Sequence, residues 1–155
     1  MPYSLDGAAG AGVVAALVTL FALAVAMFLE RSLRINVIPF LGSPFPLPGW
    51  LKDLTGLALY GGLSIVFALG YGALYSALEI ESNVIEWGVL FGLLHWAITG
   101  ALLVQVVRVH PRVRDGSILD PGPFLINLSG INGFGFLVLH ILFGMTAGFF
   151  YDALR

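Results

Sequence analysis

The sequence contains no cysteine and very little charge. The lack of cysteine excludes disulfides, iron–sulfur clusters, thiolate metal sites and covalently attached c-type haem. Lys and Arg number 7 and Asp and Glu 9, so 10% of the 155 residues are charged, whereas a soluble domain carries roughly a quarter. The net charge of −2 provides no basic stripe, and nothing therefore indicates nucleic-acid binding.

The chain instead has four long apolar runs, at about 8–29, 54–78, 84–107 and 131–154. Each has 22 to 25 residues, which at 1.5 Å per residue is enough to cross a hydrocarbon core of roughly 30 Å with some tilt. Transmembrane β-strands would be shorter, at about 10 residues, and would alternate in polarity. The sequence therefore predicts one membrane domain over residues 1–155, an all-α integral membrane bundle of four transmembrane helices.

The first apolar run is expected to remain in the protein as a helix. A secretory signal peptide begins with a positively charged stretch, but residues 1–12 contain no Lys or Arg and only one acid, Asp6. The run that follows is also longer than the apolar core of a signal peptide.

The orientation of the helices follows from the positive residues. Six of the seven Lys and Arg lie in the first and third connections, which must face the same side: Arg31, Arg34, Lys52, Arg108, Arg112 and Arg114. The positive-inside rule makes that side cytoplasmic. We therefore expect a multi-pass protein of the cell inner (cytoplasmic) membrane, with both termini outside the cytoplasm.

Residues at the helix ends are expected to meet the membrane surface. The basic cluster Arg108, Arg112 and Arg114 and the aromatic residues Trp50 and Trp87 are predicted to contact lipid headgroups. Tyr75 and Tyr151 are likewise placed in the interfacial belt, and His110 in a solvated stretch. The two long connections are rich in proline and glycine and also contain apolar residues. They either lie at the headgroup level or form a docking surface for a partner subunit.

A tandem duplication is indicated by two similar helix ends. Residues 72–78 read Gly-Ala-Leu-Tyr-Ser-Ala-Leu and residues 148–154 read Gly-Phe-Phe-Tyr-Asp-Ala-Leu, at an offset of 76 residues. A Pro/Gly-rich connection precedes each of the two helices. Each half, 1–80 and 81–155, is a helical hairpin, so the repeats are expected to be parallel and related by an axis along the membrane normal.

Small residues recur at helical spacing in every run. Membrane helices associate by close packing of such residues, because lipid tails are as apolar as the side chains they replace. We expect helix contacts at the following positions: Ala8, Gly12, Ala16, Ala68, Gly72, Ser76, Gly88, Gly92, Gly144 and Gly148.

Two histidines, His95 and His140, are the ionisable residues deep inside the predicted spans, and an ionisable residue at that depth marks a functional site by default. His95 lies roughly 17 Å and His140 roughly 21 Å from the outer ends of their helices at the standard rise. Each shares a face with glycine. We expect both to face one site inside the bundle.

Three interpretations of this pair compete. In the first, the histidines are structural and bond to each other, to Ser64, Thr99 or Thr146, or to backbone carbonyls. In the second, they ligate a b-type haem or a chlorophyll-type pigment, with Gly92 and Gly144 giving room for the macrocycle. In the third, they belong to a metal or proton path, although no carboxylate is available to complete a metal site. We expect the first.

The second half of the chain resembles a family of small prokaryotic four-helix membrane proteins whose function is unknown. The resemblance rests on Phe91-Gly-Leu-Leu-His95-Trp, His110-Pro111, Pro121-Gly-Pro-Phe124 with Asn127, and His140, Gly144, Gly148 and Tyr151, within about 65 residues. It implies the four-helix fold and no activity.

The sequence holds no nucleophile–base pair and no phosphate-binding loop, so we do not expect an enzyme. We expect a non-catalytic membrane subunit with a structural or accessory role in a larger complex, such as a bioenergetic one, in contact with lipids and with other subunits or further copies. One alternative is a haem- or chlorophyll-binding protein that uses His95 and His140. Another is a small transporter or channel formed by oligomerisation.

Overall fold

The computed structural model describes residues 3–155 and contains only helices, turns and loops over that range. The elements are α1 (Leu5–Leu29), α2 (Val37–Gly42), α3 (Gly49–Ala77), α4 (Val84–Val109), α5 (Pro111–Arg114), the 3-10 helix η1 (Pro123–Leu125) and α6 (Gly130–Leu154). Four of them, α1, α3, α4 and α6, are long and apolar enough to cross a membrane. The all-α fold and the four apolar spans are thereby confirmed.

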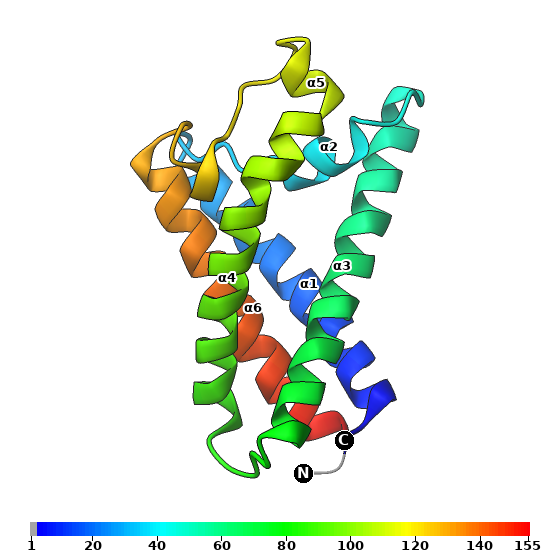
Figure 1. The fold of residues 1–155 in the computed structure, drawn as a ribbon, viewed down its shortest axis with the longest axis vertical. Coiled ribbons are helices and arrows are strands. Elements are labelled where there is room, and N and C mark those ends of the chain that lie inside the picture. Colours follow the sequence, from blue (N-terminus) through cyan, green and yellow to red (C-terminus); the bar gives the residue numbers. More distant parts are fainter. Residues whose placement is uncertain (1–2) are drawn as a thin grey trace.

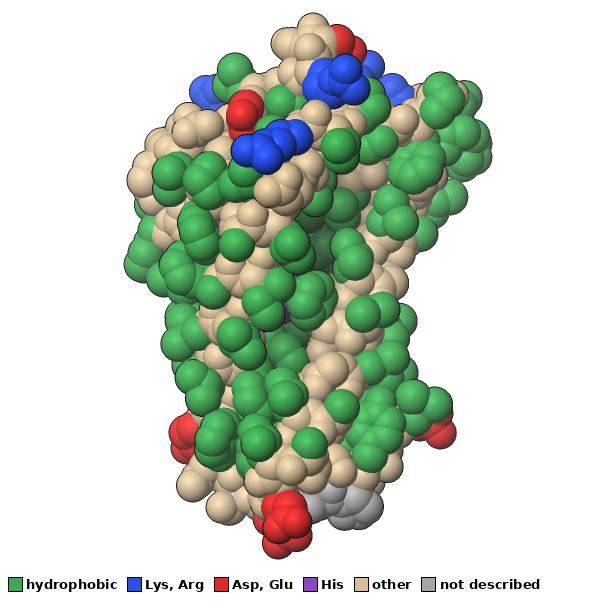
Figure 2. Space-filling view, viewed as in Figure 1, with side chains coloured by type: hydrophobic (Ala, Val, Ile, Leu, Met, Phe, Trp, Pro, Cys, Tyr) green, Lys and Arg blue, Asp and Glu red, His purple; other side chains and the backbone are tan. Residues whose placement is uncertain are grey.

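The four long helices form a bundle that is open along one side. α6 packs along both α4 and α1, and α1 packs along α3. α3 and α4 are joined by a short turn at the end where both termini lie, and from there they diverge (Figure 1). On the face shown in Figure 2, charged side chains gather at the two ends, and the side chains between the ends are mostly hydrophobic. We call the end that carries α2, α5 and η1 the basic end, and the opposite one the terminal end.

Glycines set the closest helix contacts. A Cβ built on Gly88 would collide with the Gly144 carbonyl, and one on Gly92 with the His140 carbonyl. Between α1 and α3, a Cβ on Gly12 would lie 2.9 Å from the Cα of Ile65. The small-residue positions predicted from the sequence at these places are confirmed as helix contacts, because any side chain there would push two backbones apart.

The turn between α3 and α4 is closed by the backbone. The Ile80 amide donates to the Tyr75 carbonyl at 2.9 Å, and Glu79 adopts a left-handed φ of 53°. Such a 6→1 bond with a left-handed residue is a Schellman ending, and the apolar residue that follows it packs back on the helix. Ile80 is accordingly buried in the core.

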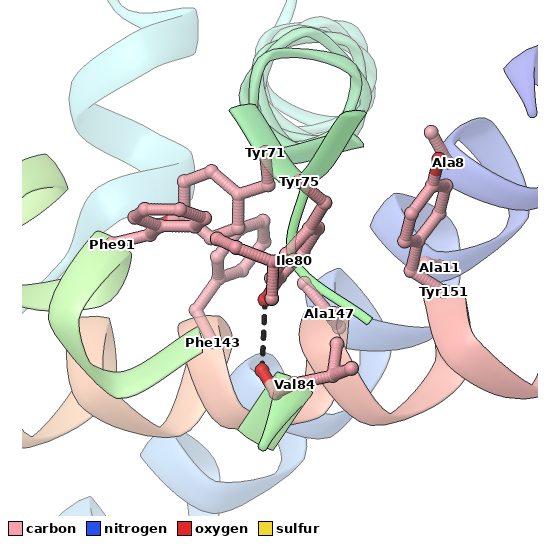
Figure 3. Packing of buried hydrophobic residues seen from close by; sticks show 11 residues of the cluster. Ala8, Ala11, Tyr71, Tyr75, Ile80, Val84, Phe91, Phe143, Ala147 and Tyr151 are labelled. Carbon is pink, nitrogen blue, oxygen red and sulfur yellow. Dashed lines mark hydrogen bonds between the residues drawn. The ribbon is translucent and has the colours of Figure 1, made fainter. Parts of the chain in front are cut away.

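Tyr75 and Tyr151 belong to the core, which corrects their placement in the interfacial belt. They are 0% and 2% exposed, and their rings stack (Figure 3). The Tyr75 hydroxyl donates to the Val84 carbonyl at 3.0 Å, and the Ser4 amide donates to the Tyr151 hydroxyl at 3.2 Å. Each phenol oxygen therefore has a hydrogen-bond partner inside the protein.

His110 is also buried, at 3% exposure, and the expectation of a solvated side chain is wrong. The ring stacks on Phe40 of α2, with centroids 4.5 Å apart. Its Nε2 lies 3.1 Å from the Phe40 carbonyl, to which it donates, and 3.3 Å from the Ser43 hydroxyl. The reason is tertiary: α2 folds over the end of α4 and covers this position.

Candidate functional site

The two intramembrane histidines lie side by side on α4 and α6. Their ring centroids are 4.6 Å apart and their planes are inclined by 77°. The backbones can approach this closely because Gly92, one turn before His95, faces the carbonyl of His140. The two rings therefore lie at a common depth and face one site, as expected from the sequence.

Each imidazole has a partner within the protein. The His140 Nδ1 lies 2.8 Å from the Phe136 carbonyl, and since a carbonyl only accepts, this nitrogen carries the proton. The His95 Nδ1 lies 3.2 Å from the Tyr71 hydroxyl of α3, and its ring stacks on Phe67 with centroids 3.5 Å apart.

Of the partners named from the sequence, His140 uses a backbone carbonyl, that of Phe136, whereas neither histidine bonds to Ser64 or Thr99. The Ser64 hydroxyl donates to the Tyr60 carbonyl of its own helix, and the Thr99 hydroxyl is buried without a hydrogen-bond partner. Tyr71 was missed because it reads as an ordinary aromatic residue of an apolar run. Its spacing of one turn from Phe67 is the signal that could have revealed it, since both meet His95 from one face of α3.

The geometry does not fit a haem held between the two histidines. An iron between two imidazoles, at about 2 Å from each nitrogen, would separate the ring centroids by about 6 Å with the porphyrin plane between them. The observed 4.6 Å is a direct contact between rings. The space beside Gly92 and Gly144 is likewise filled, because each glycine faces the backbone of the opposite helix. Ligation of a pigment by one histidine alone stays a prediction.

Residues 3–155 contain no group of three or more His, Cys, Asp or Glu side chains arranged to hold a metal ion.

A groove opens between α3 and α4 beside the histidines. It has a volume of about 270 Å³. Its lining is almost entirely apolar and aromatic: Val66, Phe67, Gly70, Tyr71, Leu74, Phe91, Leu94, His95 and Ile98. On the face shown in Figure 2 the surface is hollowed between these two helices and is mostly hydrophobic. The His95 ring thus faces the protein on one side and the groove on the other.

The residues proposed to meet headgroups lie at the helix ends. Arg108, Arg112 and Arg114 are exposed at the basic end, on the end of α4 and on α5. Trp50 is 69% exposed at the start of α3, and Trp87 is 36% exposed in the first turn of α4. Their contact with lipid headgroups stays a prediction.

The basic end also carries two ordered carboxylates. Hydrogen bonds from the hydroxyl and the amide of Ser32 lower the pKa of Glu30, and hydrogen bonds from Ser117 lower the pKa of Asp115. Both groups therefore remain ionised near neutral pH and offset part of the arginine charge.

Asn132 joins the first connection to the start of α6, a role that the sequence does not reveal. Its side chain is 1% exposed. The carbonyl oxygen accepts from the Arg34 amide at 2.6 Å, and the amide nitrogen donates to the Ser129 hydroxyl at 2.6 Å. Since the partners are 98 and 3 residues away, only the folded chain brings this set together.

Comparison of the chain with protein-family models, curated proteins and solved structures gives no match.

Proposed function

We propose that this chain is a non-catalytic, multi-pass subunit of a larger membrane assembly, in which it has a structural role. One observation carries the proposal: α3 presents small residues outward. Gly62, Ala73 and Ala77 are exposed, and a Cβ on Gly62 would meet nothing within 4 Å. Gly62 and Ala73 are eleven residues apart, about three helical turns, so they lie on one line along the helix.

The glycines inside the bundle differ from Gly62 in what surrounds them. Gly12, Gly88, Gly92 and Gly144 each meet a neighbouring backbone inside the bundle. In membranes, small residues allow helices to approach closely, and leaving one against lipid gains no packing. We call Gly62, Ala73 and Ala77 the α3 outer face, and its occupant in this proposal is a transmembrane helix of a partner subunit.

The orientation belongs to the same proposal. The basic end faces the cytoplasm, and both termini lie on the other side. We also propose the tandem duplication. It is supported by a reciprocal contact: a Cβ on Gly72 would lie 3.2 Å from the ring of Tyr151, and a Cβ on Gly148 would lie 2.8 Å from the hydroxyl of Tyr75. Gly72 of the first half thus lies against Tyr151 of the second, as Gly148 of the second half lies against Tyr75 of the first.

The proposal is tested by adding bulk to the outer face. Full-length protein is solubilised from its native membrane in a mild detergent, and the size of its assembly is measured by native electrophoresis. Gly62→Leu should release the chain from the assembly without lowering its own stability. The matched control is Ala101→Leu, at an exposed position of α4. A wild-type chain that migrates as a lone 16.5 kDa protein in its detergent micelle would contradict the proposal.

A further inference from the structure

The groove between α3 and α4 is closed at both ends by specific contacts. At the terminal end, the Tyr75 hydroxyl of α3 donates to the Val84 carbonyl at the start of α4. At the basic end, α2 packs on α3, where Gly42 and Gly56 face each other's helices, and it reaches α4 through His110. The two helices are thus joined above and below the opening. The width of the groove is therefore fixed by the contacts at its two ends.

The groove faces hydrocarbon. Its lining comes from residues 66–74 of α3 and 91–98 of α4, within two helices that are long and apolar enough to span a membrane. A molecule that enters from the side must therefore be lipid-soluble. Phe67, Tyr71 and Phe91 contribute aromatic side chains to the lining, and aromatic side chains favour contact with a planar ring over a saturated chain.

The polar atoms in the groove require an acceptor. Tyr71 and a neutral His95 carry two hydrogen-bond donors between them, one O–H and one N–H. Their 3.2 Å contact uses one donor in either tautomer. The other donor, the Tyr71 O–H or the His95 Nε2–H, has no acceptor within hydrogen-bonding distance in the part of the chain that the structure describes. A donor in an apolar environment is costly unless something accepts its hydrogen.

We propose that this groove binds a prenylated quinone, with a ring carbonyl accepting the free hydrogen of the Tyr71–His95 pair. The isoprenoid tail accounts for entry from the bilayer, and the planar ring accounts for the aromatic walls. The volume of about 270 Å³ lies just below the range of small-molecule pockets, about 300 to 1,000 Å³, and so suits one ring and the first part of a tail. A four-ring macrocycle needs more space.

Gly70 allows a sharp test. It lines the groove, and a Cβ built on it meets nothing within 4 Å. Gly70→Leu should therefore fill the groove without disturbing the helix contacts. The matched control is Ala101→Leu, at an exposed position of α4 that is absent from the groove lining. Gly62 does not line the groove either, so Gly62→Leu tests the proposed partner helix without filling the groove.

The measurement is the affinity of the full-length protein in lipid nanodiscs for a ubiquinone with a ten-carbon tail, by calorimetry. The probe should bind the wild type and Ala101→Leu alike, while Gly70→Leu should abolish binding. The double variant Tyr71→Phe/His95→Phe should weaken binding roughly 2- to 10-fold, as expected for one lost hydrogen bond. Equal binding of a ten-carbon alcohol, undiminished binding by Gly70→Leu, or no binding of the quinone would each overturn the proposal. So would a Gly70→Leu variant that loses its partner subunit and keeps its quinone affinity.

Discussion

Tyr75 and Tyr151 stack with their ring centroids 5.5 Å apart and their planes inclined by 13°. They lie near the ends of α3 and α6, and each lies against a glycine of the other's helix, Gly72 of α3 or Gly148 of α6. Together with Tyr71, Phe91 and Phe143 they form the aromatic centre of the terminal half of the bundle (Figure 3). This pair joins the two helical hairpins at the end where both termini lie.

The hydroxyl of Tyr75 should contribute to stability. Tyr75→Phe leaves the ring stack in place and removes the donor to the Val84 carbonyl, which is buried. The loss of this hydrogen bond costs about 0.5–1.5 kcal/mol, because the Val84 carbonyl, in the first turn of α4, keeps its helical partner. Unfolding in mixed micelles with increasing denaturing detergent measures the change. Tyr151→Phe is the comparison, and a free energy of unfolding equal to that of the wild type for Tyr75→Phe would refute this role.

The contact between α4 and α6 should not tolerate bulk. Gly92→Leu or Gly144→Leu forces apart two backbones that now touch, and overpacking of this kind costs about 1–3 kcal/mol. The same denaturing-detergent titration applies. Gly62→Leu adds the same side chain to an open surface and should leave stability unchanged, so equal losses in all three variants would contradict the assigned helix faces.

His110 should hold α2 against α4. His110→Ala removes both the ring stack on Phe40 and the bond to its carbonyl, so the first connection should become more accessible to protease in nanodiscs. His110→Phe retains the stack alone and should show a smaller effect. If the cleavage rate between residues 30 and 48 is the same in His110→Ala and wild type, the ring does not anchor α2.

The proposed topology predicts where reporters are active. A periplasmic reporter enzyme fused after Arg155 should be active, and the same enzyme inserted at Ser117 should be inactive, because six of the seven Lys and Arg lie on the Ser117 side. A cytoplasmic reporter should give the reverse pattern. A C-terminus found in the cytoplasm would invert the assignment or change the number of spans.

The spans were predictable because length and hydropathy are properties of local sequence. The proximity of His95 and His140 was also predictable, because their depths follow from counting residues along two adjacent helices. Tyr71, by contrast, reaches His95 from a third helix, and no local pattern shows how α3 is rotated.

The burial of His110 and the role of Asn132 were not predictable for a related reason. Both depend on where a long connection folds back: α2 covers His110, and the segment around Arg34 lies against Asn132. The same holds for the groove. It exists because α3 and α4 diverge, whereas adjacent helices joined by a short turn would ordinarily pack along their length.

The central claim, that a partner helix covers the outer face of α3, is tested most directly by site-specific crosslinking in the native membrane. The chain has no cysteine, so Ala73→Cys and the control Ala101→Cys each introduce a single thiol, and both positions are exposed. A short thiol-reactive crosslinker should give a discrete higher-mass product from Ala73→Cys and none from Ala101→Cys. No product from Ala73→Cys, or equal products from both positions, would contradict the account.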